Sequence, residues 1–223
     1  MLKEIRKMRD ALVIIGAGGH AVSVTNVALS CGMSVLAYVD DNKAGGKVME
    51  IPVISKQQCL QDFPTHNYAI AIGDNAVREK VLSEYKKDCP QAKFPALIHK
   101  SSALGMASSI GDGTIIMPLV NIGPNSIVGS FCVLNTGSSI DHDCVMSEFS
   151  SLGPRVVCGG DVNIGIRSAI CIGATVKNAV RIGADVVIGA NSYVNKSLDD
   201  NLVAYGSPCK TIRVRQKDDP YLG

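Results

Sequence analysis

The sequence lacks tryptophan altogether, and only 4% of its 223 residues are aromatic. It also lacks an excess of either charge, because 19% of the residues are charged and the formal net charge is only +2. Few aromatic rings are available to stack on bases, and a nearly neutral chain has no strong field that attracts a polyanion. These two shortages argue against nucleic acid as a partner.

Long hydrophobic runs are missing as well. The first ten residues, MLKEIRKMRD, are charged, and the apolar run ALVII that follows is far too short for a signal-peptide core or a membrane span. We therefore expect a cytoplasmic protein without a membrane partner. The eight cysteines occur at no C-x-x-C spacing, so we expect reduced thiols, mostly packed in the core, and neither a zinc site nor a redox motif.

What the sequence has in abundance is a period of six. From Leu104 onward an aliphatic residue, methionine or cysteine recurs at every sixth position, and a small or β-branched residue usually stands two positions earlier. The members are Leu104, Ile110, Ile116, Ile122, Val128, Leu134, Ile140, Met146, Leu152, Cys158, Ile164, Ile170, Val176, Ile182, Ile188 and Val194. Residues two apart in an extended chain face the same side, so each unit supplies one short strand and one turn. This period predicts a parallel β-helix with coils of about 18 residues.

Before the coil, the pattern changes to alternating strands and helices. Strands are predicted at 11–15, 34–39, 51–54 and 68–72, and helices at 21–31, 56–62 and 76–87. Alternation of this kind predicts a small parallel sheet flanked by helices. We therefore expect a Rossmann-like α/β domain over residues 1–97 and an all-β coil with a C-terminal cap over residues 98–223.

Polar or glycine-rich segments follow three of the predicted strands. They are Gly16-Ala17-Gly18-Gly19-His20, Asp40-Asp41-Asn42 and Gly73-Asp74-Asn75. Ligands of open α/β sheets bind at the carboxyl ends of the strands, where a helix N-terminus receives phosphate and an acid binds a ribose hydroxyl. A purely structural turn is the alternative interpretation. Because the domain holds only half of a dinucleotide fold, a mononucleotide or a nucleotide sugar is favoured over NAD.

A charged triplet, Asp141-His142-Asp143, interrupts the monotonous coil. The period places His142 at a corner of the prism, and the compact residues one coil away on either side, Pro124 and Gly160, leave an open notch around it. A neighbouring carboxylate orients an imidazole and raises its basicity, which suits a general base near neutral pH. Asp143 or Asp141 is the candidate partner. A solvated surface histidine is the alternative.

Six segments, taken in order, resemble a known family across nearly the whole chain. They are IIGAGGHA, YVDDN, AIGDNAVREK, ALIHKSS, LNTGSSIDHDC and GSPCK. They are similar to the bacterial sugar acyltransferases of the sialic acid O-acetyltransferase (NeuD-like) type, and to nucleotide-linked amino-sugar N-acetyltransferases of the bacillosamine-pathway type. The resemblance implies that the β-helix is left-handed, that the protein is a homotrimer, that acetyl-CoA lies in a cleft between neighbouring coils, and that the N-terminal domain holds the nucleotide sugar.

The resemblance also implies roles for individual residues. His142 matches the general base, Asp143 the acid that supports it, and Asn135 a nearby polar residue. The residues that match nucleotide-sugar loops are Gly18, Gly19, His20, Asp40, Asp41, Asn42, Gly73, Asp74 and Asn75. The residues that match acetyl-CoA contacts are Ser151, Gly160, Ile172 and Ala190. Lys210 is assigned to the same ligand on its own chemistry, because the basic tail to which it belongs can meet phosphates; a solvated face is the alternative. Ala190 stands where a glycine is more usual, and Ser151 where relatives often carry a second histidine.

The expected reaction is direct acetyl transfer from acetyl-CoA to the amine of a nucleotide-linked amino-deoxy sugar, without a metal. O-acetylation of a sialic acid-like sugar is the alternative. A β-helix carbonic anhydrase needs three metal-binding histidines, whereas only His99 and His142 lie in or beside the coil. A dehydrogenase would need a second nucleotide-binding half and a catalytic domain. A non-catalytic nucleotide-sugar sensor would bind its ligand without releasing CoA.

Overall fold

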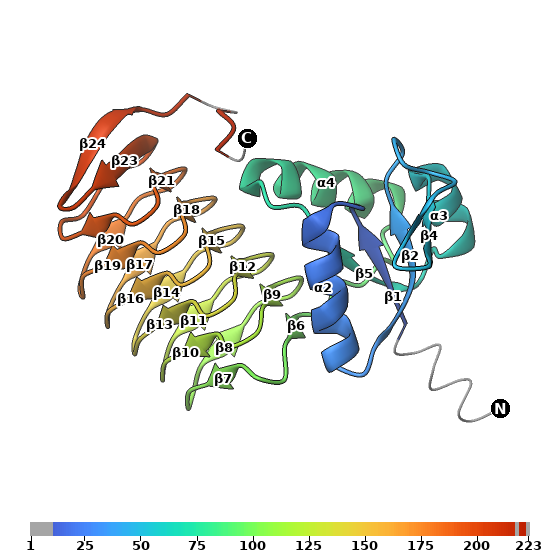
Figure 1. The fold of residues 1–223 in the computed structure, drawn as a ribbon, viewed down its shortest axis with the longest axis horizontal. Coiled ribbons are helices and arrows are strands. Elements are labelled where there is room, and N and C mark those ends of the chain that lie inside the picture. Colours follow the sequence, from blue (N-terminus) through green and yellow to red (C-terminus); the bar gives the residue numbers. More distant parts are fainter. Residues whose placement is uncertain (1–10, 217–218, 222–223) are drawn as a thin grey trace.

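The computed structural model describes residues 11–216 and 219–221, which form an α/β domain followed by a coil of short strands (Figure 1). The α/β domain contains β1 (Ala11–Ile15), α2 (Gly19–Ser30), β2 (Ser34–Val39), β3 (Lys47–Val48), β4 (Ile51–Ile54), α3 (Lys56–Asp62), β5 (Asn67–Ile70) and α4 (Asn75–Asp88). Its sheet has the order β3-β4-β2-β1-β5, in which β4, β2, β1 and β5 are parallel and β3 is antiparallel. Every predicted strand and helix of this domain is present. The two-residue strand β3 was not predicted.

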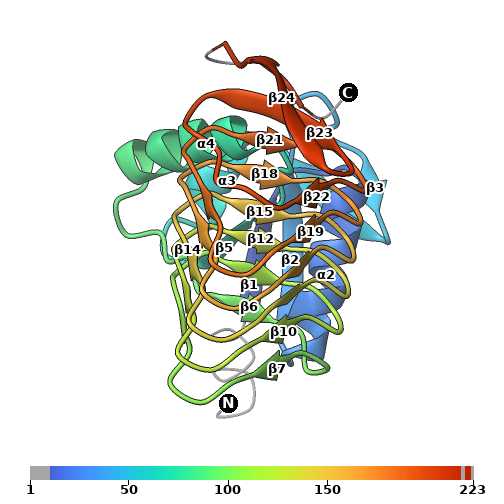
Figure 2. The same ribbon diagram turned by 90° about the vertical axis from the view of Figure 1, so that its left-hand side faces the viewer.

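The coil is a three-sided prism, and the strands that successive turns contribute to each side run parallel (Figure 2). The first coil sheet contains β7 (Ala103–Leu104), β10 (Asn121–Ile122), β13 (Ser139–Ile140), β16 (Val157–Cys158), β19 (Thr175–Val176) and β22 (Tyr193–Val194). The second contains β8 (Ser109–Ile110), β11 (Ile127–Val128), β14 (Val145–Met146), β17 (Asn163–Ile164) and β20 (Arg181–Ile182). The third contains β6 (Leu97–Ile98), β9 (Ile115–Ile116), β12 (Val133–Leu134), β15 (Ser151–Leu152), β18 (Ala169–Ile170), β21 (Val187–Ile188), β23 (Leu202–Gly206) and β24 (Cys209–Val214).

The six-residue period sets these strands. Each of its members is the second residue of a strand, and all members from Ile116 to Val194 are buried. Leu104 is 46% exposed because its strand, β7, lies at the end of the first coil sheet. Most of the small polar residues inside the coil have partners: the Ser126 hydroxyl, for example, donates to the Asp141 carbonyl and accepts the Cys144 N–H. The buried Ser138 hydroxyl has no partner within the described residues. The predicted parallel β-helix is confirmed.

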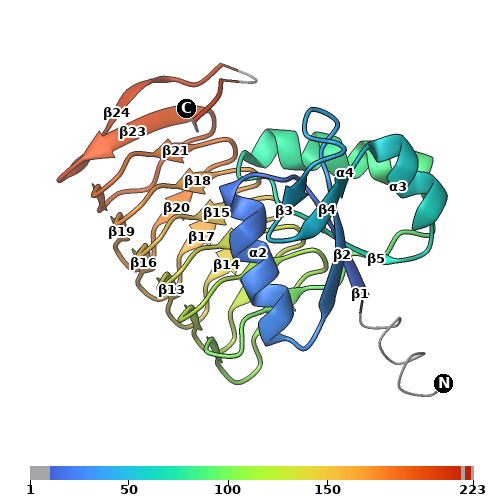
Figure 3. The same cartoon turned by 45° about the vertical axis from the view of Figure 1, so that its right-hand side comes forward.

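Helix α2 joins the α/β domain to the third coil sheet (Figures 1 and 3). Ile115 and Met117 lie on or beside strand β9 and are only 1% and 2% exposed, because α2 packs against this strand. The same hydrophobic cluster includes Val24 and Ala28 of α2 and Leu12 of β1. One core therefore continues from the α/β sheet through α2 into the coil.

Arg78 of α4 forms a second, polar connection between the two domains. Its side chain is fully buried, and its guanidinium donates five hydrogen bonds of 2.6–3.1 Å. The acceptors are the carbonyl oxygens of Ile72, Gly73, Phe131 and Phe149 and the side-chain oxygen of Asn75. Phe131 and Phe149 belong to the coil corner between the second and third sheets. A planar fork of N–H groups suits such a set of acceptors, so Arg78 holds α4 against the coil.

The last coil is covered by the hairpin β23–β24. β23 extends the third coil sheet parallel to β21, and β24 returns antiparallel to β23 through a turn with a cis Ser207–Pro208 peptide. A cap at this end of the coil was predicted and is present.

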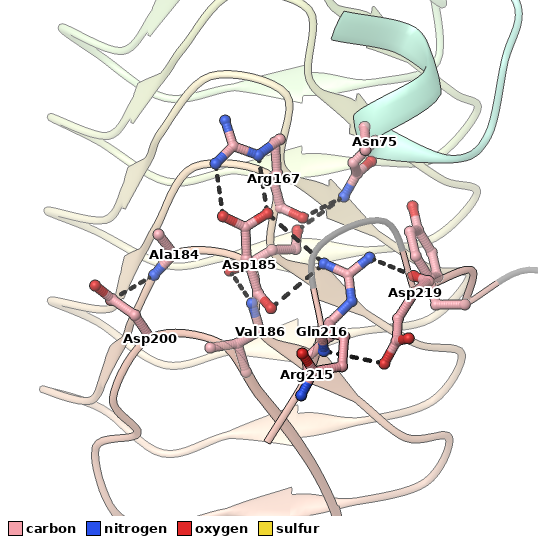
Figure 4. A network of polar contacts seen from close by, with 12 residues as sticks. Asn75, Arg167, Ala184, Asp185, Val186, Asp200, Arg215, Gln216 and Asp219 are labelled. Atoms are coloured by element: carbon pink, nitrogen blue, oxygen red, sulfur yellow. Dashed lines mark hydrogen bonds and ion pairs between the residues drawn. The ribbon is translucent and has the colours of Figure 1, made fainter. Parts of the chain in front are cut away.

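A network of charged side chains connects the coil to α4 and to the segment that follows the hairpin (Figure 4). Arg167 binds Asp185 through two hydrogen bonds of 2.6 and 2.8 Å, and it contacts Glu79 of α4 at 3.2 Å. Arg215 is 6% exposed and donates to the Asp219 carbonyl at 2.7 Å. Arg215 is therefore committed to internal contacts, whereas Lys210 of β24 is exposed.

Candidate functional site

The turn between β13 and β14 places His142 at the corner between the first and second coil sheets. Its side chain is 57% exposed, and its Nδ1 lies 2.7 Å from Oδ2 of Asp143. Asp143 has a φ of 60°, a left-handed conformation that aspartate tolerates better than most residues. The Asp141 carboxylate instead accepts the backbone N–H of His142 at 2.8 Å. Of the two predicted carboxylate partners, Asp143 is the one that holds the imidazole.

The surrounding carboxylates raise the pKa of His142 above its ordinary value. The largest cause is the hydrogen bond to Asp143, and the charge of Asp141 is the next. The pKa of Asp143 is lowered by its hydrogen bond to His142 and by a second one from Asn125. Because an ionised carboxylate only accepts hydrogen bonds, Nδ1 carries the proton of the neutral ring and Nε2 keeps a free lone pair. This arrangement can act as a general base.

Gly160 lies one coil after His142 and makes room for its ring. A Cβ atom at Gly160 would lie 2.5 Å from Nε2 and 2.6 Å from Cε1 of His142. Any side chain at this position would therefore displace the imidazole. The predicted notch around His142 is present, and the absent side chain of Gly160 forms one of its walls.

We expect Gly160→Ala to lower kcat by about 10–10²-fold, because a displacement of about 1 Å at a reacting group costs rate on this scale. The fold should survive, since the φ of Gly160 lies outside the left-handed region and the added methyl meets a side chain that can move. Steady-state kinetics and a thermal melt of the same preparation measure both effects.

A double variant supplies the control for this prediction. Once His142→Ala has removed the ring, adding Gly160→Ala should change turnover by less than about twofold, because the two residues act through one contact. A further loss of the size seen in the single variant would contradict the role assigned to Gly160.

Asn135, assigned from the resemblance to the same site, lies at a different corner. It directly follows β12, between the third and first coil sheets, and its Nδ2 donates to the Leu152 carbonyl at 3.0 Å. His142 comes one side of the prism later. Within one chain, the two residues therefore belong to separate corners.

The predicted acetyl-CoA residues are likewise spread over the coil. Gly160 shares the corner of His142, whereas Ile172 and Ala190 are exposed at the corner that follows the third coil sheet. Ser151 is 8% exposed in β15, and its Oγ lies 3.5 Å from the hydroxyl of Tyr221. One chain does not bring Ile172, Ala190 and Ser151 to the imidazole.

Tyr221 was not singled out from the sequence, and nothing in its local sequence marks it. Its hydroxyl donates to the Gly73 carbonyl at 2.9 Å and approaches Ser151 of the coil. The C-terminal tail therefore connects the coil to the segment that follows β5 in the α/β domain.

The three polar segments of the α/β domain meet at one edge, as predicted. They follow β1, β2 and β5, which are adjacent and parallel. Gly16 has a φ of 108°, and a Cβ there would lie 2.9 Å from the Ala71 carbonyl oxygen, so this turn requires glycine. Gly18 and Gly19 are exposed, and a Cβ on either would meet nothing within 4 Å. They leave open space at the N-terminus of α2, where a phosphate or sugar can approach.

The loop after β2 is shaped by its own carboxylates. Asp40 accepts the Asn42 N–H at 3.1 Å, and Asp41 accepts the Lys56 N–H at 2.8 Å. Lys43, which sequence reasoning missed, donates from Nζ to the Ala17 carbonyl at 2.9 Å. The side chain thus brings a cation to the glycine-rich loop. Its position directly after the polar triplet was the available signal.

His20 and Asn75 are more enclosed than expected of ligand-contacting residues. Burial, and then the charge of Arg78, lower the pKa of His20 to about 4, so the ring is neutral. Asn75 is 1% exposed, and its amide donates to the Arg167 and Ser168 carbonyls of the coil. Contrary to our expectation, the Asn75 side chain faces the coil. Asp74 caps α4 through the Ala76 and Val77 N–H groups.

Within residues 11–216 and 219–221, no group of three histidine, cysteine or acidic side chains is placed to hold a metal ion. No helix in this part of the chain has the length and apolar character that a membrane crossing requires. All eight cysteines are free.

Comparison with known proteins identifies relatives of both domains. Residues 11–85 match the PglD N-terminal domain. The chain is 30% identical over 185 residues to GDP-perosamine N-acetyltransferase of Escherichia coli O157:H7, an alignment that covers 79% of this chain and 82% of the relative.

Solved structures of relatives match this chain over nearly its full length. A histidine-to-alanine variant of GDP-perosamine N-acetyltransferase from Caulobacter crescentus, in complex with CoA and GDP-perosamine, is 32% identical with a TM-score of 0.86 over 91% of this chain and 97% of that one. The acetyltransferase domain of PglB from Neisseria gonorrhoeae FA1090, in complex with acetyl coenzyme A, is 27% identical with a TM-score of 0.85 over 92% and 100%. The predicted α/β domain with a left-handed β-helix is confirmed. The chain belongs to the family of acetyl-CoA-dependent sugar acetyltransferases that includes GDP-perosamine N-acetyltransferase and the PglB/PglD-type enzymes.

Proposed function

We propose that this protein transfers the acetyl group of acetyl-CoA to the amine of a nucleotide-linked amino-deoxy sugar. The observation that carries the proposal is the 2.7 Å pairing of His142 with Asp143 at an open corner of the coil. The open glycine-rich edge of the α/β domain supplies a place for the nucleotide part. Because full-length relatives were solved with GDP-perosamine, a GDP-linked amino sugar is the first candidate substrate.

In the proposed reaction, Nε2 of His142 accepts a proton from the amine as its nitrogen attacks the thioester carbonyl carbon. The new C–N bond forms a tetrahedral intermediate, whose collapse breaks the C–S bond. The imidazolium then returns its proton to the departing CoA thiolate, so that the base is regenerated. Asp143 keeps the ring oriented and stabilises its positive charge during the step.

We further propose that the site is completed by assembly into a homotrimer. In one chain, His142 and Gly160 lie at one corner, while Ile172 and Ala190 lie at another. If the corner of His142 in one chain faces the corner of Ile172 in the next chain, the two sets of residues come together. Exposed apolar side chains on the first and second coil sheets support such packing, since Val157 and Ile127 are 47% and 50% exposed. A monomeric molar mass by light scattering at assay concentration would overturn the trimer.

A substrate panel tests the proposed reaction. Release of CoA thiol should be fastest with a GDP-, UDP- or dTDP-linked amino sugar, and mass spectrometry with NMR should show a new amide. Sialic acid in the same panel tests the alternative, in which an ester forms on a hydroxyl. Thiol release with sialic acid and with none of the amino sugars would overturn the proposal.

The raised pKa of His142 predicts how turnover depends on pH. A general base acts in its neutral form, so kcat/KM, which reports the free enzyme, should rise with pH through the pKa of His142, with a midpoint above the ordinary 6.5. Asp143→Asn removes the largest cause of the rise. Its midpoint should therefore move to lower pH, and its plateau should fall by about 10–10²-fold, because the Asn125 amide holds the one remaining oxygen and the new NH2 group, a donor, faces Nδ1. An unchanged midpoint would contradict the assignment of Asp143 as the partner.

A further inference from the structure

Asn125 extends the pair at the corner into a chain of three side chains. It occupies the equivalent turn one coil earlier, 18 residues before Asp143, and its Nδ2 donates to Oδ1 of Asp143 at 3.1 Å. The other oxygen of the same carboxylate, Oδ2, lies 2.7 Å from Nδ1 of His142. We propose that Asn125 is a positioning residue that orients Asp143 and, through it, the imidazole. This inference rests on the proposed role of His142.

The backbone of the coil aligns Asn125 with Asp143, because the two residues occupy equivalent turns of successive coils. Asn125 and Asp143 have φ values of 57° and 60°, and each donates its N–H to the coil before it, to the Met106 and Pro124 carbonyls. Two successive turns in the same left-handed conformation place their side chains directly above each other. Asparagine and aspartate are among the few residues that adopt this conformation readily.

The carboxylate needs such an anchor because it is exposed. Asp143 is 53% exposed, so without a second contact its side chain exchanges among rotamers and its bond to His142 is intermittent. The Asn125 amide occupies Oδ1 and so leaves Oδ2 directed at the ring. Asp141 and Asp161 also act on His142 by charge. Nδ1, however, donates its hydrogen bond to Asp143, so the orientation of this carboxylate decides the tautomer of the ring.

A merely structural role is the competing explanation. On the neighbouring strand pair, Asn121 makes a similar contact of 3.3 Å with Ser139 one coil later. The experiment therefore needs a measurement that does not depend on the stability of the coil. The tautomer of His142 is such a readout, since nitrogen-15 NMR distinguishes a ring protonated at Nδ1 from one protonated at Nε2.

Asn125→Gly removes the amide and keeps the left-handed turn without strain. We expect kcat to fall by about tenfold through lost orientation, with the KM for acetyl-CoA unchanged within about twofold. The neutral His142 ring should change from the Nδ1–H form toward a mixture of both tautomers. Asn201→Gly is the matched control, because Asn201 has a φ of 59° and lies near the opposite end of the coil. It should leave the kinetics and the His142 signals as in the wild type.

Asn125→Asp replaces the donor with an acceptor of the same shape. At about pH 8 both carboxylates are ionised and repel, so this variant should be at least as slow as Asn125→Gly.

Support for the proposal requires that Asn125→Gly changes both turnover and tautomer. If His142→Ala loses turnover, a change in only one of them, or in neither, overturns the positioning role. The proposed function fails separately, if His142→Ala retains turnover. In that event the NMR measurement still decides whether Asn125 orients the imidazole through Asp143.

Discussion

His142→Ala should lower kcat by about 10²–10⁴-fold, the range typical of a lost general base. The side chain is 57% exposed and its contacts are polar, so the fold should be preserved. The melting temperature should stay within about 3 °C of the wild type, as for most surface substitutions. Thiol release at saturating acetyl-CoA and amino-sugar substrate measures the first effect, and calorimetry measures the second.

His99→Ala is the matched control for this variant. His99 lies at the start of the coil, and its Nδ1 contacts the Ser101 hydroxyl at 2.8 Å instead of a carboxylate. Turnover of His99→Ala should equal that of the wild type within about twofold. If His142→Ala behaved like His99→Ala, a solvated surface histidine would be the correct interpretation of the triplet.

Arg78→Met should give the largest loss of stability. The substitution leaves the carbonyl oxygens of Ile72, Phe131 and Phe149 and the side-chain oxygen of Asn75 without the donor that Arg78 supplies, at about 1–3 kcal/mol for each buried group, offset in part because the buried charge is also removed. The Gly73 carbonyl keeps the hydroxyl of Tyr221. We expect the free energy of unfolding to fall by about 3–5 kcal/mol. For a chain of this size, the melting temperature should drop by about 6–20 °C. Calorimetry and urea unfolding measure the loss.

Two further variants test whether the loss of stability is specific to the guanidinium of Arg78. Lys80→Met, an exposed position on the same helix, should change stability by less than about 0.5 kcal/mol. Arg78→Lys retains a charge but replaces the planar fork with a single ammonium group, so it should remain well below the wild type. A wild-type melting temperature for Arg78→Lys would show that charge, and not the fork of donors, holds α4 against the coil.

Much of this fold was predictable because its causes are local. The six-residue period places one inward side chain per strand, and the resulting coil follows from extended-chain geometry alone. The elements of the α/β domain were predictable for the same reason, since each is bounded by its own apolar run and turn residues. The pairing of His142 with Asp143 was also predictable in kind, because the two residues are adjacent. Which of Asp141 and Asp143 bonds to the ring depended on the φ of 60° at Asp143.

The tertiary structure decided what depends on contacts between distant segments. Asn125 reaches Asp143 across 18 residues, and Tyr221 reaches Gly73 across 148. The burial of Asn75 and Arg78 could not be inferred from their polar side chains, because it results from docking α4 on coil carbonyls. The amino-acid sequence by itself determined the strands, the turns and the corner that carries His142 and Asp143, since these follow from neighbouring residues. Packing between domains and between stacked coils decided which polar groups remain open to a ligand.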